Sequence, residues 1–153
     1  MSGFVAGGVS TGFNLVNDGF WPDIDADKLR DAQRIESAIT NARLEVATVA
    51  AMVSVNKDLR SCKLKWQASG HASLAKVPAD QIGGKSVLVH SYLRAVYCAT
   101  SAEVAERYRS YDSTNSGEAK AAEETSSIDE YRRDQRWAVR DLLGVGRTTV
   151  ELI

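Results

Sequence analysis

The sequence predicts an all-α protein: a small helical bundle built on a long antiparallel helical hairpin, with a flexible N-terminal arm and an extended C-terminal tail. Three observations predict it. The 153 residues include only two prolines, so long helices can run uninterrupted. Apolar residues recur three or four positions apart through much of the chain, as on one helix face. The length suits one domain, placed at residues 25–144 between an arm (1–24) and a tail (145–153).

The arm is expected to be flexible up to the first helix. Residues 1–20 contain five glycines and keep neither a helical nor an alternating apolar pattern for long. Pro22 disfavours helical geometry at Trp21, and Asp25 is placed to accept a backbone hydrogen bond as an N-cap. We therefore expect the first helix to begin at Asp25 and to continue to about Ile39.

Two long helices follow, over residues 41–69 and 86–111, and their lengths predict the antiparallel hairpin. Thr40 is the expected cap of the earlier helix, and Gly70 is its expected end.

This earlier helix is apolar on two sides. A main stripe runs through Leu44, and Val46, Val53 and Leu64 lie nearly opposite that stripe. Such a helix is either central in its domain or shared with a neighbouring subunit.

Residues 112–126 are small, polar and without periodicity, so a mobile loop is expected there. The last helix is expected to start at a capping box formed by Ser127 and Glu130 and to end at Gly144. Winding it at about 100° per residue places Trp137 opposite the apolar face and gathers the arginines on a face of their own. These arginines are Arg132, Arg133, Arg136 and Arg140.

Charge and composition exclude several classes of function. The net charge of -1 gives no overall attraction to nucleic acid or to an anionic membrane. No apolar run approaches the roughly 20 residues that span a bilayer, so no membrane partner is expected. Cys62 and Cys98 lie inside expected helices and are interpreted as packed free thiols. No nucleophile motif is formed, so we expect no enzyme, no catalytic residue and no cofactor.

Two short stretches imitate ligand-binding motifs. Asp23, Asp25 and Asp27 match the first positions of a calcium loop, but Lys28 and Arg34 stand where that loop needs glycine and glutamate. The stretch IGGKS imitates the end of a phosphate-binding loop but lacks its first glycine and a preceding strand. No metal site is expected.

An alternative function rests on the end of the chain. The stretch GVGRTT resembles the hairpin of helix-hairpin-helix DNA-binding motifs, in which backbone amides hold a phosphate. Few residues follow Gly146, and Arg147 is the nearby basic residue. A small DNA-binding protein that uses this segment is therefore the alternative.

Several stretches together resemble a known family. They are FWPDID, ARLEVA, KVPADQIGGKSV, YLRAVYCA, ERYRSYD and SSIDEYRRDQRWAVRDLLG. Their order over residues 20–153 is similar to that in the head completion proteins of contractile-tailed bacteriophages, the GpL type. Spread over the whole domain, the resemblance is more specific than any one motif.

The resemblance implies a structural head-to-tail connector without catalysis. Such an adaptor docks on the portal vertex after DNA packaging, seals the filled capsid and offers a surface for tail attachment. The implied partners are the portal protein, a tail terminator or neighbouring neck protein, and further copies in a dodecameric ring, with contact to packaged DNA. The implied location is the neck of the virion, after assembly in the host cytoplasm.

Candidate interface residues follow from this reading. Phe20 and Trp21 are expected to anchor the arm on the body or on a neighbour. The arginine face, with Trp137, is expected to meet an acidic neighbour or the DNA channel. The apolar end of the chain is expected to add to a partner by strand pairing or groove insertion. The candidates are Phe20, Trp21, Arg132, Arg136, Trp137, Arg140, Arg147, Val150, Leu152 and Ile153.

Overall fold

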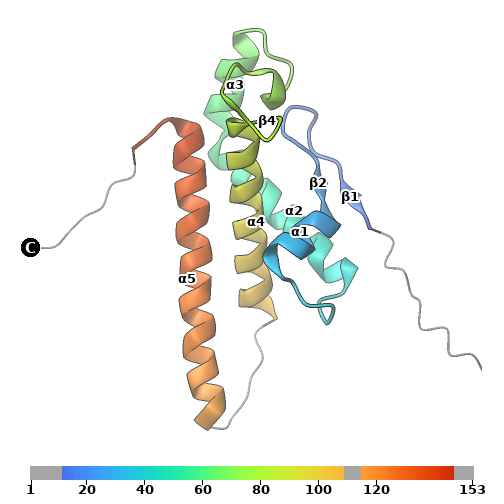
Figure 1. Ribbon diagram of the computed structural model, residues 1–153, viewed down its shortest axis with the longest axis vertical. Helices are drawn as coiled ribbons and strands as arrows, with labels where there is room; N and C mark the ends of the chain where they lie inside the picture. Colours follow the sequence, from blue (N-terminus) through green and yellow to red (C-terminus); the bar gives the residue numbers. More distant parts are fainter. Residues whose placement is uncertain (1–11, 109–114, 147–153) are drawn as a thin grey trace, which may run out of the picture.

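The computed structural model describes the backbone of residues 12–108 and 115–146, and the side chains of these residues except 115–126. Within this part, the chain is mostly helical and carries two small antiparallel sheets, so the all-α expectation holds only in part (Figure 1). The helices are α1 (Ala26–Gln33), α2 (Asn41–Asp58), α3 (Arg60–Ala68), the 3-10 turn η1 (Leu74–Lys76), α4 (Val87–Arg107) and α5 (Asn115–Leu143). The strands are β1 (Asn14–Leu15), β2 (Ile24–Asp25), β3 (Gln81–Ile82) and β4 (Lys85–Ser86).

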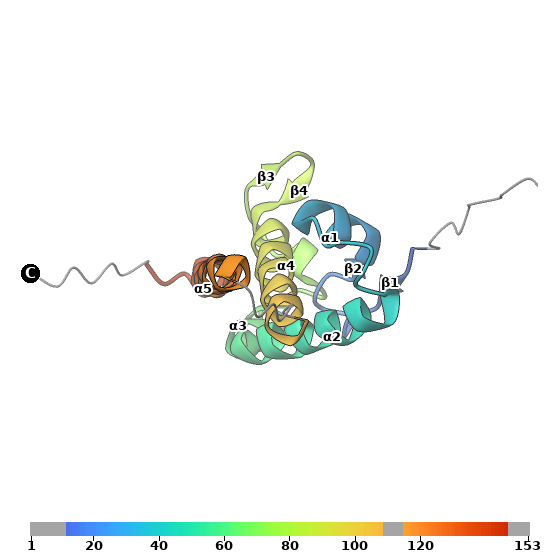
Figure 2. The same ribbon diagram turned by 90° about the horizontal axis from the view of Figure 1, so that it is seen from below.

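Helix α4 is the central element of the fold. It packs against α5 on one side and against α2 on the other, and α4 and α5 run side by side in opposite directions (Figures 1 and 2). The buried residues of α4 lie on several of its sides. They include the larger Tyr92 and Val96 and the small Ala95, Ala99 and Ala102. Small side chains let neighbouring helices approach closely, and burial on several sides explains why α4 lacks a single apolar face.

The start of α1 is as predicted, but its end is earlier. The Asp25 carboxylate accepts hydrogen bonds from the amides of Asp27 and Lys28, which confirms it as the N-cap. The helix ends at Gln33 because Arg34 takes a left-handed conformation with φ 53°. The Arg30 guanidinium then donates to carbonyls of the following turn, so the segment up to Ile39 folds as a cap instead of further helix.

The helix predicted over residues 41–69 is divided in two. Thr40 accepts a hydrogen bond from the Arg43 amide, which confirms this cap. Leu59 leaves helical geometry while its amide still bonds to Val55, so α3 follows α2 after a one-residue break. Gly70 has a φ of 90°, which suits a glycine just after a helix.

The two-stranded sheet β3–β4 occupies the stretch that imitated a phosphate-binding loop. Gln81 pairs with Ser86 and Ile82 with Lys85, which leaves a two-residue turn of Gly83 and Gly84. Both glycines have positive φ, at 59° and 74°, as a tight hairpin turn requires. The glycines therefore serve a turn, and Ser86 caps α4 through the Leu88 amide.

Two expectations about flexible segments need correction. Residues 12–24 do not form a free arm, because β1 pairs with β2 and the Ala26 amide donates to the Phe13 carbonyl. Residues 115–126 are helical backbone within α5, so Ser127 lies inside that helix and not at its start. The latter segment lacks apolar periodicity but is rich in alanine and glutamate, which favour helix without any packing partner. Residues 1–11, 112–114 and 147–153, which complete the predicted arm, loop and tail, lie outside the described part.

Candidate partner-binding surfaces

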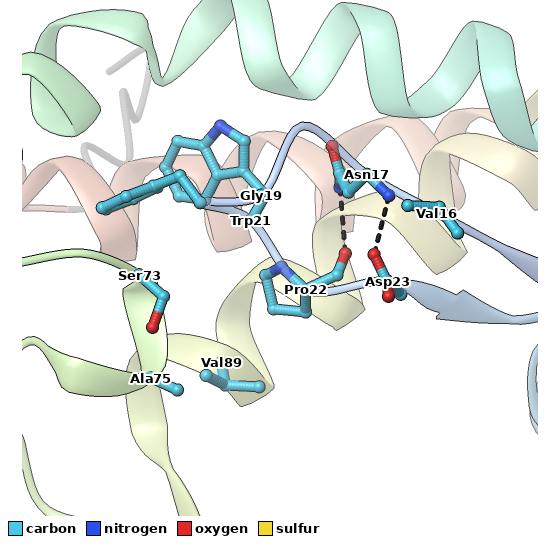
Figure 3. A pocket seen from close by; sticks show the side chains of 10 residues that line it. Val16, Asn17, Gly19, Trp21, Pro22, Asp23, Ser73, Ala75 and Val89 are labelled. Carbon is cyan, nitrogen blue, oxygen red and sulfur yellow. Dashed lines mark hydrogen bonds between the residues drawn. The ribbon is translucent and has the colours of Figure 1, made fainter.

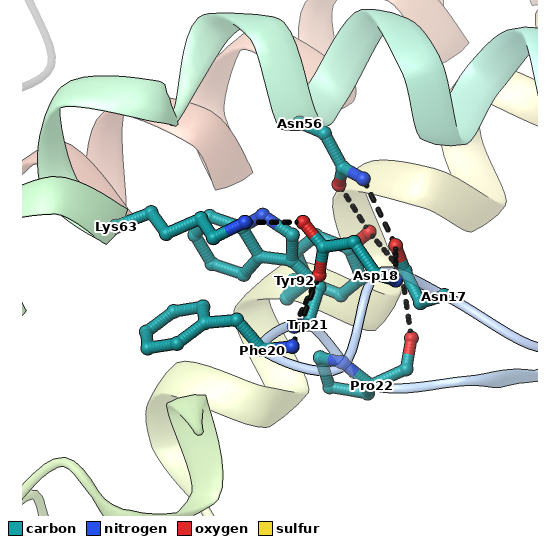
Figure 4. Close-up of polar contacts among 8 residues, drawn as sticks. All are labelled: Asn17, Asp18, Phe20, Trp21, Pro22, Asn56, Lys63 and Tyr92. Atoms are coloured by element: carbon teal, nitrogen blue, oxygen red, sulfur yellow. Dashed lines mark hydrogen bonds and ion pairs between the residues drawn. The ribbon is translucent and has the colours of Figure 1, made fainter. Parts of the chain in front are cut away.

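The connection between β1 and β2 is held to the helices by a closed set of amide and hydroxyl groups (Figure 4). The Asn17 amide donates to the Tyr92 hydroxyl at 2.7 Å, and that hydroxyl donates to the Asn56 side-chain oxygen at 2.6 Å. Asn56 completes the circuit by donating to the Asn17 side-chain oxygen at 2.9 Å. Tyr92 is fully buried, and this burial raises the pKa of its phenol. The circuit fixes the N-terminal connection against both α2 and α4.

A charged contact strengthens the same connection. The Asp18 carboxylate lies 2.6 Å from the Lys63 ammonium on α3 and also accepts from the amides of Phe20 and Trp21. Burial alone would raise the pKa of Asp18, but the hydrogen bonds from Lys63 and the two amides outweigh it and lower the pKa. The carboxylate therefore stays ionised and ties the connection to α3.

Phe20 and Trp21 form an aromatic cluster inside the chain. Each is 3% exposed. The Trp21 ring stacks on Tyr92 at a centroid distance of 5.0 Å, and both Phe20 and Trp21 contact the Trp66 ring at 6.3 Å. The two residues thus anchor the N-terminal segment on its own body. Their burial places both rings in the core, so little of either side chain is exposed to a partner in this conformation.

A groove of about 380 Å³ lies beside this cluster, between the β1–β2 connection and the η1–α4 region (Figure 3). Apolar atoms of Val16, Pro22, Ala75 and Val89 contribute to its lining, and Asp23 adds a carboxylate. The Trp21 indole nitrogen is buried without a hydrogen-bond partner among the described residues, yet Figure 3 shows it pointing away from Ala75. The groove therefore offers apolar surface with an acidic side chain, and it lacks a converging set of polar groups.

The arginine face of α5 is partly occupied by the chain's own acids. Arg132 contacts both carboxylate oxygens of Glu106 on α4, at 2.7 and 3.0 Å, and also reaches Glu103 at 3.3 Å. The hydrogen bonds that it donates to Glu106 raise the pKa of the Arg132 guanidinium. The acidic surface that was expected opposite Arg132 is thus supplied by α4 of the same chain.

The other arginines of this face differ in exposure and in contacts. Arg136 is exposed. The Arg133 guanidinium lies 4.7 Å from the centre of the half-buried Trp137 ring, a cation–π contact that accounts for an indole away from the apolar face. Arg140 donates to the Gly146 carbonyl at 2.7 Å. Arg136 is therefore the predicted contact residue on this face whose side chain is most open to solvent.

The second apolar side predicted for the long helix is solvent-exposed on α2 and α3. Val46 is 56% exposed, Val53 is 64% exposed and Leu64 is 56% exposed, and Val49 joins them at 43%. The three valines are spaced by three and four residues, so they lie along one side of α2. We call the set of Val46, Val49 and Val53 the valine stripe. An apolar row of this kind is typical of a surface that a partner covers.

The sequence did not indicate the Asn17, Asn56 and Tyr92 circuit. Tyr92 is 75 positions from Asn17 and 36 positions from Asn56 in the sequence, and no local pattern connects them. A signal was present only in retrospect, since a polar Asn56 interrupts the apolar side of α2. Arg147, Val150, Leu152 and Ile153 lie outside the described residues.

Neither a metal-binding cluster nor a membrane-spanning helix is found among the described residues. Among them, no group of three or more histidine, cysteine, aspartate or glutamate side chains is arranged to hold a metal ion. No helix within the described ranges is long and apolar enough to cross a membrane.

Comparison with known proteins gives a consistent result. Residues 15–153 match the family model for phage head completion proteins (GPL). The head completion/stabilization protein of Escherichia phage P2 is 40% identical over 139 residues, which cover 91% of this chain and 82% of that relative. No solved structure matches the chain significantly. With a family match over almost its whole length and this degree of identity, the chain belongs to the phage head completion protein (GPL) family.

Proposed function

We propose that this protein is a structural connector that docks on the portal vertex after DNA packaging, closes the filled head and offers a surface to the tail. Membership of the head completion family over residues 15–153 carries the proposal. The name of the phage P2 relative, which refers to head completion and stabilization, points the same way. The protein acts by binding, in the neck of the virion, after assembly in the host cytoplasm.

The architecture supports a connector. A connector must hold its shape while several surfaces bind different neighbours, and the closed circuit around Tyr92 and the Asp18–Lys63 contact make the N-terminal part of this domain rigid. Among the surfaces that the described residues leave open to partners, two are separate from the groove. One is the valine stripe of α2, and the other is the α5 side that carries Arg136.

We assign portal docking to the end of the chain. The segment 148–153 alternates apolar and polar residues at Val150, Glu151 and Leu152 and ends in Ile153, as a segment that adds to a partner's strand or groove does. Arg147 alone separates it from Gly146, whose carbonyl accepts a hydrogen bond from Arg140, so the last helix fixes the chain just before the segment. Arg147 adds a positive charge at its start.

The side of α5 that carries Arg136 faces the packaged DNA or an acidic neck protein. The exposed guanidinium groups of Arg133 and Arg136 are not a DNA-binding site by themselves, but copies repeated around a ring present a circle of positive charge to a central channel. The neighbouring neck protein or tail terminator then meets the ring from the other end. This division of surfaces requires no cofactor and no catalytic group.

Electron cryo-microscopy of the purified protein with its cognate portal tests the docking. We expect a closed ring of copies on the portal, with the chain ends inserted in portal surfaces. The same protein truncated after Arg147 should keep its helical circular dichroism spectrum but lose portal binding. Portal binding by the truncated protein would remove the assigned role of residues 148–153.

The DNA-binding alternative gives a different result in the same samples. If the intact protein bound duplex DNA with an affinity that falls steeply with salt, and failed to bind portal at any salt concentration, the connector function would be refuted. Replacing Arg136 by Glu tests the channel contact separately. Filled heads that carry the Arg136→Glu protein should lose DNA faster than wild-type heads, whereas equal DNA retention would contradict that contact.

A further inference from the structure

We propose that the α2–α3 surface binds, head to tail, the surface formed by the β1–β2 connection and α1 on a second copy of this chain. The first surface carries the valine stripe and a basic end. The second carries the apolar groove and a row of carboxylates. The valine stripe, Val16 and the carboxylates are exposed, and each surface supplies what the other lacks.

The valine stripe becomes basic toward its C-terminal end. Lys57 follows Val53 at helical spacing, and Arg60 begins α3; both side chains are exposed. Lys65 adds a third exposed cation near the exposed Leu64. Asp58 is the acid within this basic end, so residues 57–65 remain net positive.

The opposite pattern is found on the N-terminal side. Asp23 lines the groove, and the exposed Asp27 and Asp31 follow one helical turn apart on α1. Val16, 77% exposed, lies at the same groove and provides the apolar part. This region also holds three basic residues, Lys28, Arg30 and Arg34. The Arg30 guanidinium donates to backbone carbonyls, and the Lys28 ammonium lies 3.7 Å from the Asp25 carboxylate. The surface keeps a net negative charge.

The positions of the two surfaces suit a repeating contact. Figure 2 shows α1 on one side of α4, and α2 with α3 on another side. A contact between two different surfaces is heterologous, and it leaves one surface of each kind free on every pair. Repeated copies therefore add in one direction, and they close into a ring when the rotation between neighbours permits. Desolvated apolar area supplies affinity, and the charges set the register.

Charge reversal with mixing tests this contact. One variant carries Lys57→Glu and Arg60→Glu, and the other carries Asp27→Lys and Asp31→Lys. Each variant alone opposes like charges, so sedimentation velocity should show self-association weakened by about tenfold or more relative to wild type. An equimolar mixture should recover association, because every contact in the mixture can pair opposite charges.

A matched control separates the contact from a general charge effect. Replacing the exposed Lys85 by Glu changes the net charge as much as Lys57→Glu alone, but Lys85 lies on the β3–β4 hairpin and does not line the groove. This control should associate like wild type. A second test replaces Val49 and Val53 by Ser, which should weaken association without lowering the melting temperature, because both valines are exposed. Circular dichroism spectra verify that each variant is folded.

The inference rests on the proposed function because the contact is taken to join neighbouring copies on the portal. The head-to-tail contact and portal docking can nevertheless fail separately. Native mass spectrometry of portal complexes counts the bound copies. Full occupancy by both charge variants alone, with unchanged association in solution, would overturn the head-to-tail contact and leave portal docking intact. A different result would overturn portal docking alone. In it, wild type self-associates, mixing the two charge variants restores association, and no protein binds portal. A wild-type chain that stays monomeric both alone and with portal would overturn both.

Discussion

Replacing Tyr92 by Phe removes one hydroxyl from the centre of the fold while keeping the ring. The hydroxyl accepts from Asn17 at 2.7 Å and donates to Asn56 at 2.6 Å. The ring itself keeps its stacking on Trp21. The substitution therefore tests the polar circuit and leaves the apolar packing of Tyr92 in place.

The expected loss of stability can be worked from these two hydrogen bonds. Each contributes about 1 kcal/mol net, and the amides that lose their partner add a desolvation cost where water cannot replace it. Asn56 is half-buried, so part of that cost is recovered by solvent. We expect a decrease of about 2 kcal/mol in the free energy of unfolding, which corresponds to a melting temperature lower by roughly 4–8 °C for a domain of this size.

Urea and thermal denaturation followed by circular dichroism measure this change. Tyr97→Phe is the matched control, because Tyr97 is half-buried and the described residues show no hydrogen bond from its hydroxyl. It should differ from wild type by less than about 0.5 kcal/mol. In the double variant Tyr92→Phe with Asn56→Ala, the two losses should be less than additive by about 1 kcal/mol. A Tyr92→Phe protein as stable as the Tyr97 control would refute the stabilising role of the circuit.

Three further predictions concern stability. The pKa values of Asp18 and Glu103 are lowered from ordinary values of 3.8 and 4.5. Their contribution to the free energy of unfolding is therefore present above those values and is lost as the pH falls through the lower folded-state pKa values. Asp18→Asn should make acid unfolding less steep, and an unchanged pH profile would contradict this. Gly84→Ala should cost about 1–2 kcal/mol because φ is 74°. Urea denaturation measures this loss against Gly146→Ala, a glycine without a positive φ and with open space for a Cβ atom. Leu44→Ala should cost roughly 2–5 kcal/mol because Leu44 is fully buried, and a loss below about 1 kcal/mol would show that α2 packs differently.

The sequence predicted the features that depend on near neighbours in the chain. Asp25 and Thr40 are caps because a carboxylate or hydroxyl just before a helix reaches amides two or three residues ahead. The second apolar side of α2 was also predicted, since helical spacing alone places Val46 and Val53 opposite the main stripe, and the structure leaves that side exposed. Family membership was indicated by stretches that resemble the family in the same order along the chain, and the match over residues 15–153 confirms it.

The error at residues 115–126 has a different cause. Periodicity detects helices through the apolar face that they bury, and this segment has no such face in its sequence. Its alanines and glutamates favour helix through intrinsic propensity, and the packed part of α5 that follows extends the same helix. A prediction that gave propensity more weight would have placed the start of α5 near Asn115.

Contacts between distant residues decided the rest. The sequence alone determined that the chain is mainly helical, where several helices begin, and that α2 carries apolar residues on a second side. Only the tertiary structure decided that Phe20 and Trp21 lie in the core and that Arg132 is satisfied by Glu106. The physical reason is that burial and ion pairing depend on which surfaces the packing of α4 brings together, and no local pattern of residues records that arrangement.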